Sequence, residues 1–261
     1  MKTLLLLVLL ICTTHALRSQ TKQVSLEGTQ SIDLTSSGNG ETYQLQVALP
    51  FGYSSSQTRY KTLYVLDANV SFGMVRDIQT LISFEPQNEP LIVVGIAYTN
   101  FNEWISKRGR DYIPGQGSGA EQFHDFLETQ VIPKIGQLYR TSEQRILYGH
   151  SSGGVFGFLS LFKSPDLFSG YILTSPSVDE DREYTLKALT DWQPTTRGST
   201  RLFISIGKEE KASFQTAYSQ LEQRLKQISS DGFSFHSVHV DGTHMSSMPQ
   251  ALIQGLQFVN Q

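Results

Sequence analysis

The chain has 261 residues, 39% of them hydrophobic, which is enough to fill the core of one domain without cross-links. The formal net charge of −3 at pH 7 argues against a nucleic-acid partner, because nucleic-acid-binding domains are basic. The single cysteine, Cys12, excludes a disulfide framework and leaves the rest of the chain without a thiol nucleophile or a cysteine-ligated metal.

The first residues have the pattern of an export signal. Lys2 supplies a positive start, the run from Leu4 to Cys12 is apolar, and Ala16 closes a small-residue cleavage site. This run is too short to cross a bilayer, which takes about 20 residues. We therefore expect a signal peptide at 1–16, a single mature domain at 17–261, no stable membrane insertion, and a periplasmic or secreted protein. A retained anchor is the alternative.

The rest of the chain alternates between strand-like and helix-like patterns. Segments 31–35 and 42–49 alternate with period two around a glycine-rich stretch, which predicts an antiparallel hairpin at a sheet edge. Runs 62–67 and 91–97 are continuously apolar, as buried parallel strands are. Further strands are expected at 146–148, 171–176, 201–207 and 233–240, and helices at 72–84, 123–138, 155–162, 214–228 and 251–259.

This alternation predicts an α/β fold: a mostly parallel central sheet with helices on both faces and an antiparallel N-terminal edge. It is the order of elements in an α/β-hydrolase. Residues 99–119 have no periodic pattern and are expected to form a long irregular loop, which in a compact domain is usually functional. The oligomeric state is left open.

Residues 145–154 read Arg-Ile-Leu-Tyr-Gly-His-Ser-Ser-Gly-Gly and contain a G-x-S-x-G pentapeptide between a β-prone segment and a helix-like run. This is the context of a nucleophile elbow, in which the serine occupies a sharp strand-to-helix turn and the glycines avoid collisions. The N-terminus of the following helix directs free N–H groups at the same point, which suits a developing oxyanion. We predict Ser151 as a nucleophile. An ordinary glycine-rich turn is the alternative.

A serine needs a base, and in this fold the acid and then the histidine follow the serine along the chain. Histidines beyond the predicted signal stand at 124, 150, 236, 239 and 244. The first precedes the elbow, the second lies within it, and the next two fall in the last predicted strand. His244 alone lies in a loop beyond that strand, from which it can reach Ser151. His244 is therefore the predicted base.

The acid is expected after the strand that ends near Gly207, where the chain has Glu209 and Glu210. Either carboxylate can orient the imidazole and stabilise its charged form. Glu210 is the first choice and Glu209 the second. Ordinary charges at a helix N-terminus are the alternative, and so is a dyad without a strong acid.

The oxyanion hole needs two backbone N–H groups about 3 Å from the charged oxygen. Ser152, which follows the nucleophile, is expected to supply one. The second is expected from the loop after Asp67, where Ala68 and Asn69 are the candidates.

Residues 99–119 also contain the candidate substrate contacts. Arg108 and Arg110, flanked by Trp104 and Tyr112, are suited to an anionic aromatic acyl group such as a catecholate. The alternative is a solvated loop in which Arg108 pairs with Asp111. The sequence contains no metal-ligand cluster and no dinucleotide-binding fingerprint, so no metal and no cofactor is expected.

Over about residues 40–260 the chain resembles the esterase family of the α/β-hydrolase superfamily that includes enterobactin and other siderophore esterases. The resemblance is carried, in the family's order, by Leu63-Tyr-Val-Leu-Asp-Ala68, Val93-Val-Gly-Ile96, Arg108-Gly-Arg-Asp-Tyr-Ile-Pro114, Val131-Ile-Pro-Lys-Ile135, Tyr139-Arg-Thr141, Gly149-His-Ser-Ser-Gly-Gly154, Ser175-Pro-Ser177 and Gly242-Thr-His-Met-Ser246. It implies Ser151 as nucleophile, His244 as base, and the segment after Asp67 as the second oxyanion donor.

Two positions depart from the family's pattern. Ala68 stands where a glycine is usual, and Val178-Asp-Glu-Asp181 follows Ser-Pro-Ser where tryptophans are frequent. Both border the expected substrate site, so they bear on the substrate more than on the chemistry. The leading interpretation is an exported serine esterase acting on a small-molecule ester, with a siderophore triester among the candidates. Esters of acylated sugars or hydroxycinnamates are the alternative substrates, and a catalytically inactive binding protein with this fold is the alternative from another class.

Overall fold

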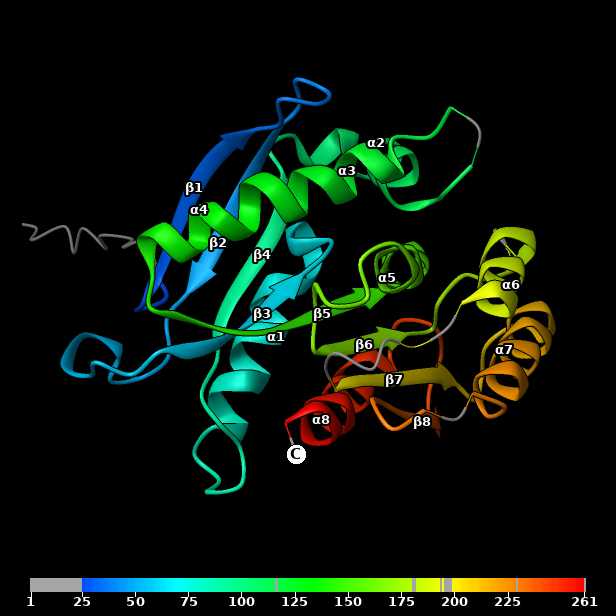
Figure 1. The fold of residues 1–261 in the computed structure, drawn as a ribbon. Helices are drawn as coiled ribbons and strands as arrows, with labels where there is room; N and C mark the ends of the chain where they lie inside the picture. The colour runs from blue at the N-terminus through cyan, green and yellow to red at the C-terminus, as the bar shows by residue number, and fades with distance from the viewer. Residues whose placement is uncertain are drawn as a thin grey trace, which may run out of the picture.

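The computed structural model describes residues 25–115, 117–179, 182–192, 194, 199–228 and 230–260, so the predicted signal peptide at 1–16 lies outside the described residues. These residues form an eight-stranded sheet with the strand order β1-β2-β4-β3-β5-β6-β7-β8 (Figure 1). The strands are β1 (Thr29–Thr35), β2 (Thr42–Ala48), β3 (Tyr60–Val65), β4 (Ile92–Tyr98), β5 (Thr141–His150), β6 (Gly170–Thr174), β7 (Thr200–Gly207) and β8 (Phe233–Val240). The helices are α1 (Ala68–Ile82), α2 (Trp104–Tyr112), α3 (Ala120–Phe126), α4 (Ile132–Leu138), α5 (Ser152–Lys163), α6 (Arg182–Asp191), α7 (Ala212–Leu225) and α8 (Met248–Val259). Two 3-10 helices, η1 (Tyr53–Ser55) and η2 (Phe101–Glu103), and a π-helix between α3 and α4, η3 (Leu127–Val131), complete them.

The pairing of the strands confirms the expected architecture. β1 pairs antiparallel with β2 and β2 antiparallel with β4, whereas all other neighbours pair parallel. Every residue of β4 is buried, as expected for a strand whose two faces are both covered. The hairpin of β1 and β2 therefore forms the antiparallel N-terminal edge of a mostly parallel sheet.

Apolar side chains fill the space on both faces of the sheet. On one face, α3, α5 and α7 contribute buried residues such as Phe123, Phe156 and Tyr218. On the other, α1 and α8 contribute Val75 and Leu252. Because β3 and β5 to β8 run parallel between these layers, the loops at their carboxyl ends emerge at the same edge of the sheet. Side chains far apart in the sequence are brought together there.

Residues 99–119 differ from the expected irregular loop, because they contain η2 and the helix α2 (Figure 1). The inward side of α2 carries Trp104, Arg108, Asp111 and Tyr112, at helical spacing. These side chains are aromatic and charged rather than aliphatic. A search for apolar periodicity therefore does not detect the helix.

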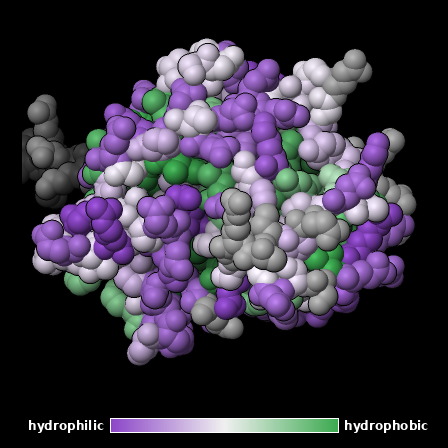
Figure 2. Space-filling model, viewed as in Figure 1, coloured by the Kyte–Doolittle hydropathy of each residue, from purple (hydrophilic) through white to green (hydrophobic). Residues whose placement is uncertain are grey.

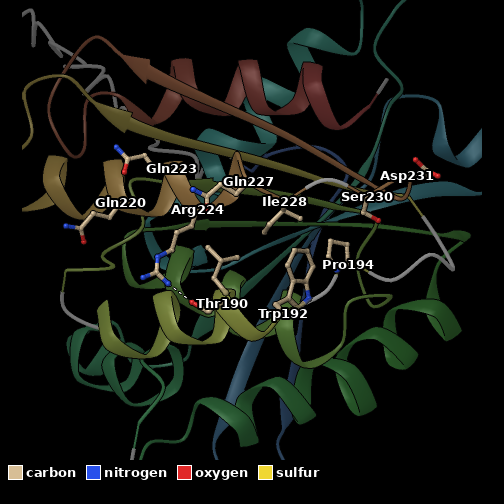
Figure 3. Close-up of a pocket in the computed structure, with 11 residues that line it drawn as sticks. Thr190, Trp192, Pro194, Gln220, Gln223, Arg224, Gln227, Ile228, Ser230 and Asp231 are labelled. Carbon is tan, nitrogen blue, oxygen red and sulfur yellow. Dashed lines mark hydrogen bonds between the residues drawn. The ribbon is translucent and has the colours of Figure 1, made fainter.

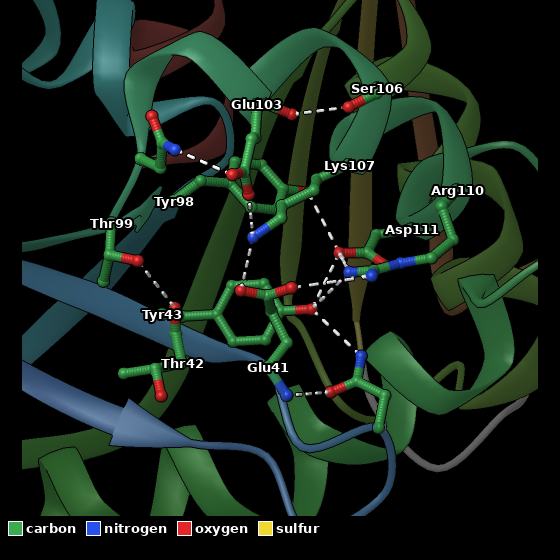
Figure 4. Close-up of polar contacts among 12 residues, drawn as sticks. Glu41, Thr42, Tyr43, Tyr98, Thr99, Glu103, Ser106, Lys107, Arg110 and Asp111 are labelled. Carbon is green, nitrogen blue, oxygen red and sulfur yellow. Dashed lines mark hydrogen bonds and ion pairs between the residues drawn. The ribbon is translucent and has the colours of Figure 1, made fainter.

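Polar contacts hold α2 against the N-terminal hairpin (Figure 4). Lys107 pairs with Glu103 one turn earlier at 2.7 Å, and with Glu41 at 2.8 Å. The buried carboxylate of Asp111 accepts hydrogen bonds from the hydroxyls of Tyr43, at 2.7 Å, and Tyr98, at 3.1 Å. Burial of Asp111 is thus matched by donors, as a buried charge requires.

The face seen in Figure 2 is covered mainly by polar side chains, with apolar ones in small patches between them. Among the described residues, no helix combines the length and the apolar character needed to cross a membrane.

Candidate active site

Ser151 lies between β5 and α5 with φ 59° and ψ −121°, a backbone conformation that is strained for a residue with a side chain. Two glycines make the turn possible, Gly149 of the motif and Gly154, which directly follows it. A Cβ at Gly149 would lie 2.2 Å from the Gly153 carbonyl oxygen, and one at Gly154 would lie 2.9 Å from the Cβ of Pro176. The G-x-S-x-G motif therefore forms the sharp turn that its sequence predicts.

Ser175-Pro176-Ser177, which follows β6, contacts both the serine and the predicted acid. Ser177 is buried, its Oγ lies 2.8 Å from Ser151 Oγ, and its N–H donates to the Ser151 carbonyl at 3.2 Å. Ser175 has a positive φ of 45° and donates its hydroxyl to Glu210 Oε1 at 2.5 Å. Neither serine was among the predicted site residues. Ser-Pro-Ser is part of the family resemblance, but the sequence does not indicate that it touches two site residues.

His244 and Glu210 meet across two loops, 34 positions apart in the chain. His244 Nδ1 lies 2.8 Å from Glu210 Oε2, and the glutamate side chain is only 1% exposed. Its other oxygen accepts from Ser175 and from the Gly207 N–H. Burial favours the protonated acid, but the hydrogen bonds from His244, Ser175 and Gly207 outweigh it and lower the pKa of Glu210 below its usual 4.5.

Glu209, the second choice for the acid, is exposed. Its backbone N–H donates to the Gly242 carbonyl at 3.0 Å, which ties the loop after β7 to the loop that carries His244. The structure therefore places Glu210, and not Glu209, against the imidazole.

The candidate oxyanion donors lie at two helix N-termini, where the first N–H groups have no partner within the helix. Ser152 is the first residue of α5, and Ala68 and Asn69 begin α1 after Asp67, whose φ is 54°. The Asn69 side chain exchanges two 2.8 Å hydrogen bonds with the backbone of Tyr98. Because its side chain is already bonded, Asn69 can offer an oxyanion only its backbone N–H.

Ala68, which replaces the family's usual glycine, is accommodated by a glycine on the neighbouring strand. A Cβ at Gly95 of β4 would lie 2.6 Å from the Cβ of Ala68. The alanine methyl thus occupies the space that a side chain at position 95 would need.

Arg108 is fixed at the elbow by a bidentate pair with Asp67, in which Nε and Nη2 each lie 2.8 Å from a carboxylate oxygen. Its Nη1 donates to Ser152 Oγ at 3.1 Å. Trp104 donates its ring N–H to the same carboxylate at 2.7 Å. Arg108 therefore contacts the residues on both sides of Ser151, His150 and Ser152, and Trp104 shares its partner Asp67.

Three expectations for α2 need correction or qualification. The alternative pairing of Arg108 with Asp111 is wrong, because it is Arg110 that contacts Asp111, at 2.6 Å (Figure 4). Tyr112 is fully buried and accepts the Asp67 N–H at 3.2 Å, so its ring packs in the core and does not face a substrate. The Arg110 guanidinium is directed at Asp111 and Glu41, and a substrate contact from it stays a prediction.

The described residues contain no group of three or more His, Cys, Asp or Glu side chains that could hold a metal ion. A surface pocket of about 1120 Å³ lies between α6 and α7 and is lined by residues such as Trp192, Gln220 and Arg224 (Figure 3). Ser151, His244 and Glu210 do not line it, so the reactive groups and this pocket are separate features.

Comparison with known proteins places the chain in a family. The model of the esterase family described as "Putative esterase" matches residues 36–255. A ferri-bacillibactin esterase from Bacillus subtilis is 26% identical over 262 aligned positions, covering 90% of each chain.

Two solved structures have similar folds. An IroE-like serine hydrolase from Shewanella oneidensis is 25% identical, with a TM-score of 0.78 over 88% of this chain and 79% of that one. The BES protein from Bacillus cereus, at 24% identity, has a TM-score of 0.82 over 92% of this chain and 98% of that one. The chain belongs to this esterase family and is a carboxylic ester hydrolase.

Proposed function

We propose that the chain hydrolyses its ester through an acyl-enzyme formed on Ser151, with His244 as general base and Glu210 as the acid that orients it. The observation that carries the proposal is the hydrogen bond between His244 Nδ1 and Glu210 at the edge of the sheet that presents the Ser151 elbow. A carboxylate on Nδ1 fixes the tautomer whose Nε2 accepts a proton, and it stabilises the imidazolium that forms.

In the first half-reaction, Nε2 of His244 takes the Ser151 hydroxyl proton while Oγ bonds to the ester carbonyl carbon. The carbonyl oxygen becomes an oxyanion that accepts hydrogen bonds from the N–H of Ser152 and from that of Ala68 or Asn69. Collapse breaks the bond to the alcohol, which leaves with the proton from His244. Water, activated by the same histidine, then releases the acid and regenerates Ser151.

We propose the substrate class from the charged and aromatic side chains near the elbow. Arg108 already pairs with Asp67, so its charge is matched within the chain. Phe101 is 58% exposed and stacks on Trp104, with ring centroids 5.8 Å apart. An aromatic surface here fits a substrate with aromatic acyl groups, such as a catecholate siderophore triester, and the similarity to the ferri-bacillibactin esterase favours that class. The same surface also suits hydroxycinnamoyl esters.

The substrate proposal is tested by comparing kcat/KM on a catecholate siderophore triester, a feruloyl ester, an acetylated sugar and a short nitrophenyl ester. We expect the triester to give the highest value, because its aromatic groups can contact Phe101 and Trp104. A preference for the feruloyl ester or the acetylated sugar would replace the siderophore assignment and leave the acyl-enzyme chemistry intact.

We also propose that the protein is exported and that residues 1–16 are removed. The support is the pattern of a positive start, a short apolar run and a small-residue site that ends at Ala16. Mass measurement of the protein from a secreting host is expected to give a chain that begins at Leu17. A product that retains Met1 would contradict both export and cleavage.

A further inference from the structure

His150, the residue immediately before the nucleophile, packs its ring against the ring of His244. The ring centroids are 4.5 Å apart and the planes are tilted by 50°. Phe214 of α7 contacts the same His244 ring edge-on at 5.3 Å. His244 is thus held by one hydrogen bond, to Glu210, and by two rings.

His150 is itself fixed. It is the last residue of β5, it is only 7% exposed, and its Nδ1 lies 2.9 Å from Oγ1 of Thr174, its register partner on β6. Arg108 Nη2 also approaches its carbonyl oxygen, at 3.4 Å. The His150 ring is therefore held rigidly at the end of the sheet. His244, in contrast, lies on a loop with its side chain 31% exposed.

The second nitrogen of His150, Nε2, is buried and has no hydrogen-bond partner among the described residues. A buried polar atom without a partner costs free energy, so His150 stands at this position at a cost to stability. The same residue is joined by one peptide bond to Ser151 and packs on the residue proposed as its base.

The charged and titratable groups around His150 are His244, Glu210 and Arg108. Burial, and then the proximity of His244, lower the pKa of His150 to about 3, while Glu210 acts in the opposite direction. The ring is therefore uncharged at neutral pH. It therefore places no second positive charge beside His244.

We propose that His150 is a positioning residue: its buried ring, anchored on Thr174, fixes the His244 imidazole relative to Ser151. The inference rests on the proposed function, because it concerns the same pair of residues. It assigns a role to the first variable position of the G-x-S-x-G motif; the second, Ser152, already supplies a candidate oxyanion N–H.

The test compares His150→Ala, which removes the ring, with His150→Phe, which keeps a ring without nitrogens. His150→Ala should lower kcat by about 10–100-fold, the cost of misplacing a catalytic group by about 1 Å, with little change in KM. His150→Phe keeps a ring against His244 but loses the bond to Thr174, so it should recover part of the kcat, to about the level of Thr174→Val.

His124→Ala is the matched control, because His124 is another buried histidine, but it lies on α3, with its Nδ1 3.7 Å from the carboxylates of Asp125 and Glu128 and its ring near Phe156. It should lower the melting temperature without lowering kcat. If His150→Ala does not fold, Thr174→Val, which removes the anchor of the ring, should give a smaller loss of kcat.

The proposal is overturned if His150→Ala, or Thr174→Val in its place, keeps the wild-type kcat. It is also overturned if folded His150→Phe is as slow as His150→Ala, since ring packing would then not be the cause. Wild-type protein without esterase activity, or activity that survives Ser151→Ala, would instead overturn the proposed function.

Discussion

Ser151→Ala is expected to lower kcat on a simple nitrophenyl ester by about 10⁴–10⁶ while leaving the fold intact. The loss is large because the oxyanion donors alone, acting on water, replace an activated alkoxide poorly. Activity and melting temperature should be measured on the same preparation. Ser219→Ala is the matched control, because that hydroxyl lies on α7 and bonds to the Gln215 carbonyl, and it should leave kcat near the wild-type value.

The same experiment extends to the base. His244→Ala should cost nearly as much as Ser151→Ala, and the double variant should be little worse than either, because residues that act as one unit are not additive. One equivalent of an organophosphate should inactivate the wild type and add its mass to the peptide that contains Ser151. If a clean preparation of Ser151→Ala kept more than about a hundredth of the activity, the acyl-enzyme on Ser151 would be wrong.

The second large effect is expected at the acid. Glu210→Gln should lower kcat by about 10²–10⁴, because an amide cannot stabilise the imidazolium and favours the wrong tautomer of His244. Glu209→Gln should be close to wild type, since that side chain is exposed and the loop contact uses its backbone N–H. The pair is well matched, because both variants remove one negative charge at neighbouring positions.

The pH profile tests the state of Glu210. Its pKa is lowered, so the carboxylate is charged at its usual 4.5 and above, and its support of His244 is lost only as the pH falls through the lower value. Protonation of Glu210 should therefore cause no loss of activity above about pH 4.5. Equal rates for Glu210→Gln and Glu209→Gln would point to a dyad or to an acid elsewhere.

Local patterns in the sequence were enough to predict the sheet and the elbow. Strand and helix periods depend on neighbouring residues, and the hairpin of β1 and β2, the buried β3 and β4, and the turn at Ser151 all follow from them. His244 could be singled out because the order of strands limits which histidine lies on a loop at the correct edge. The helix α2 was missed, because its inward face is aromatic and charged.

Contacts between distant segments could be decided only by the tertiary structure. The sequence ranks Glu210 before Glu209 without excluding either, but the turn after Gly207 directs only Glu210 at a histidine 34 positions away. Arg108 and Arg110 are two residues apart, yet helix geometry turns one toward Asp67 and the other toward Asp111. The sequence by itself therefore determined the fold class and the elbow serine, because these depend on local spacing. The partner of each charged group is decided only when distant loops come together in the folded chain, and a local sequence pattern contains no information on such contacts.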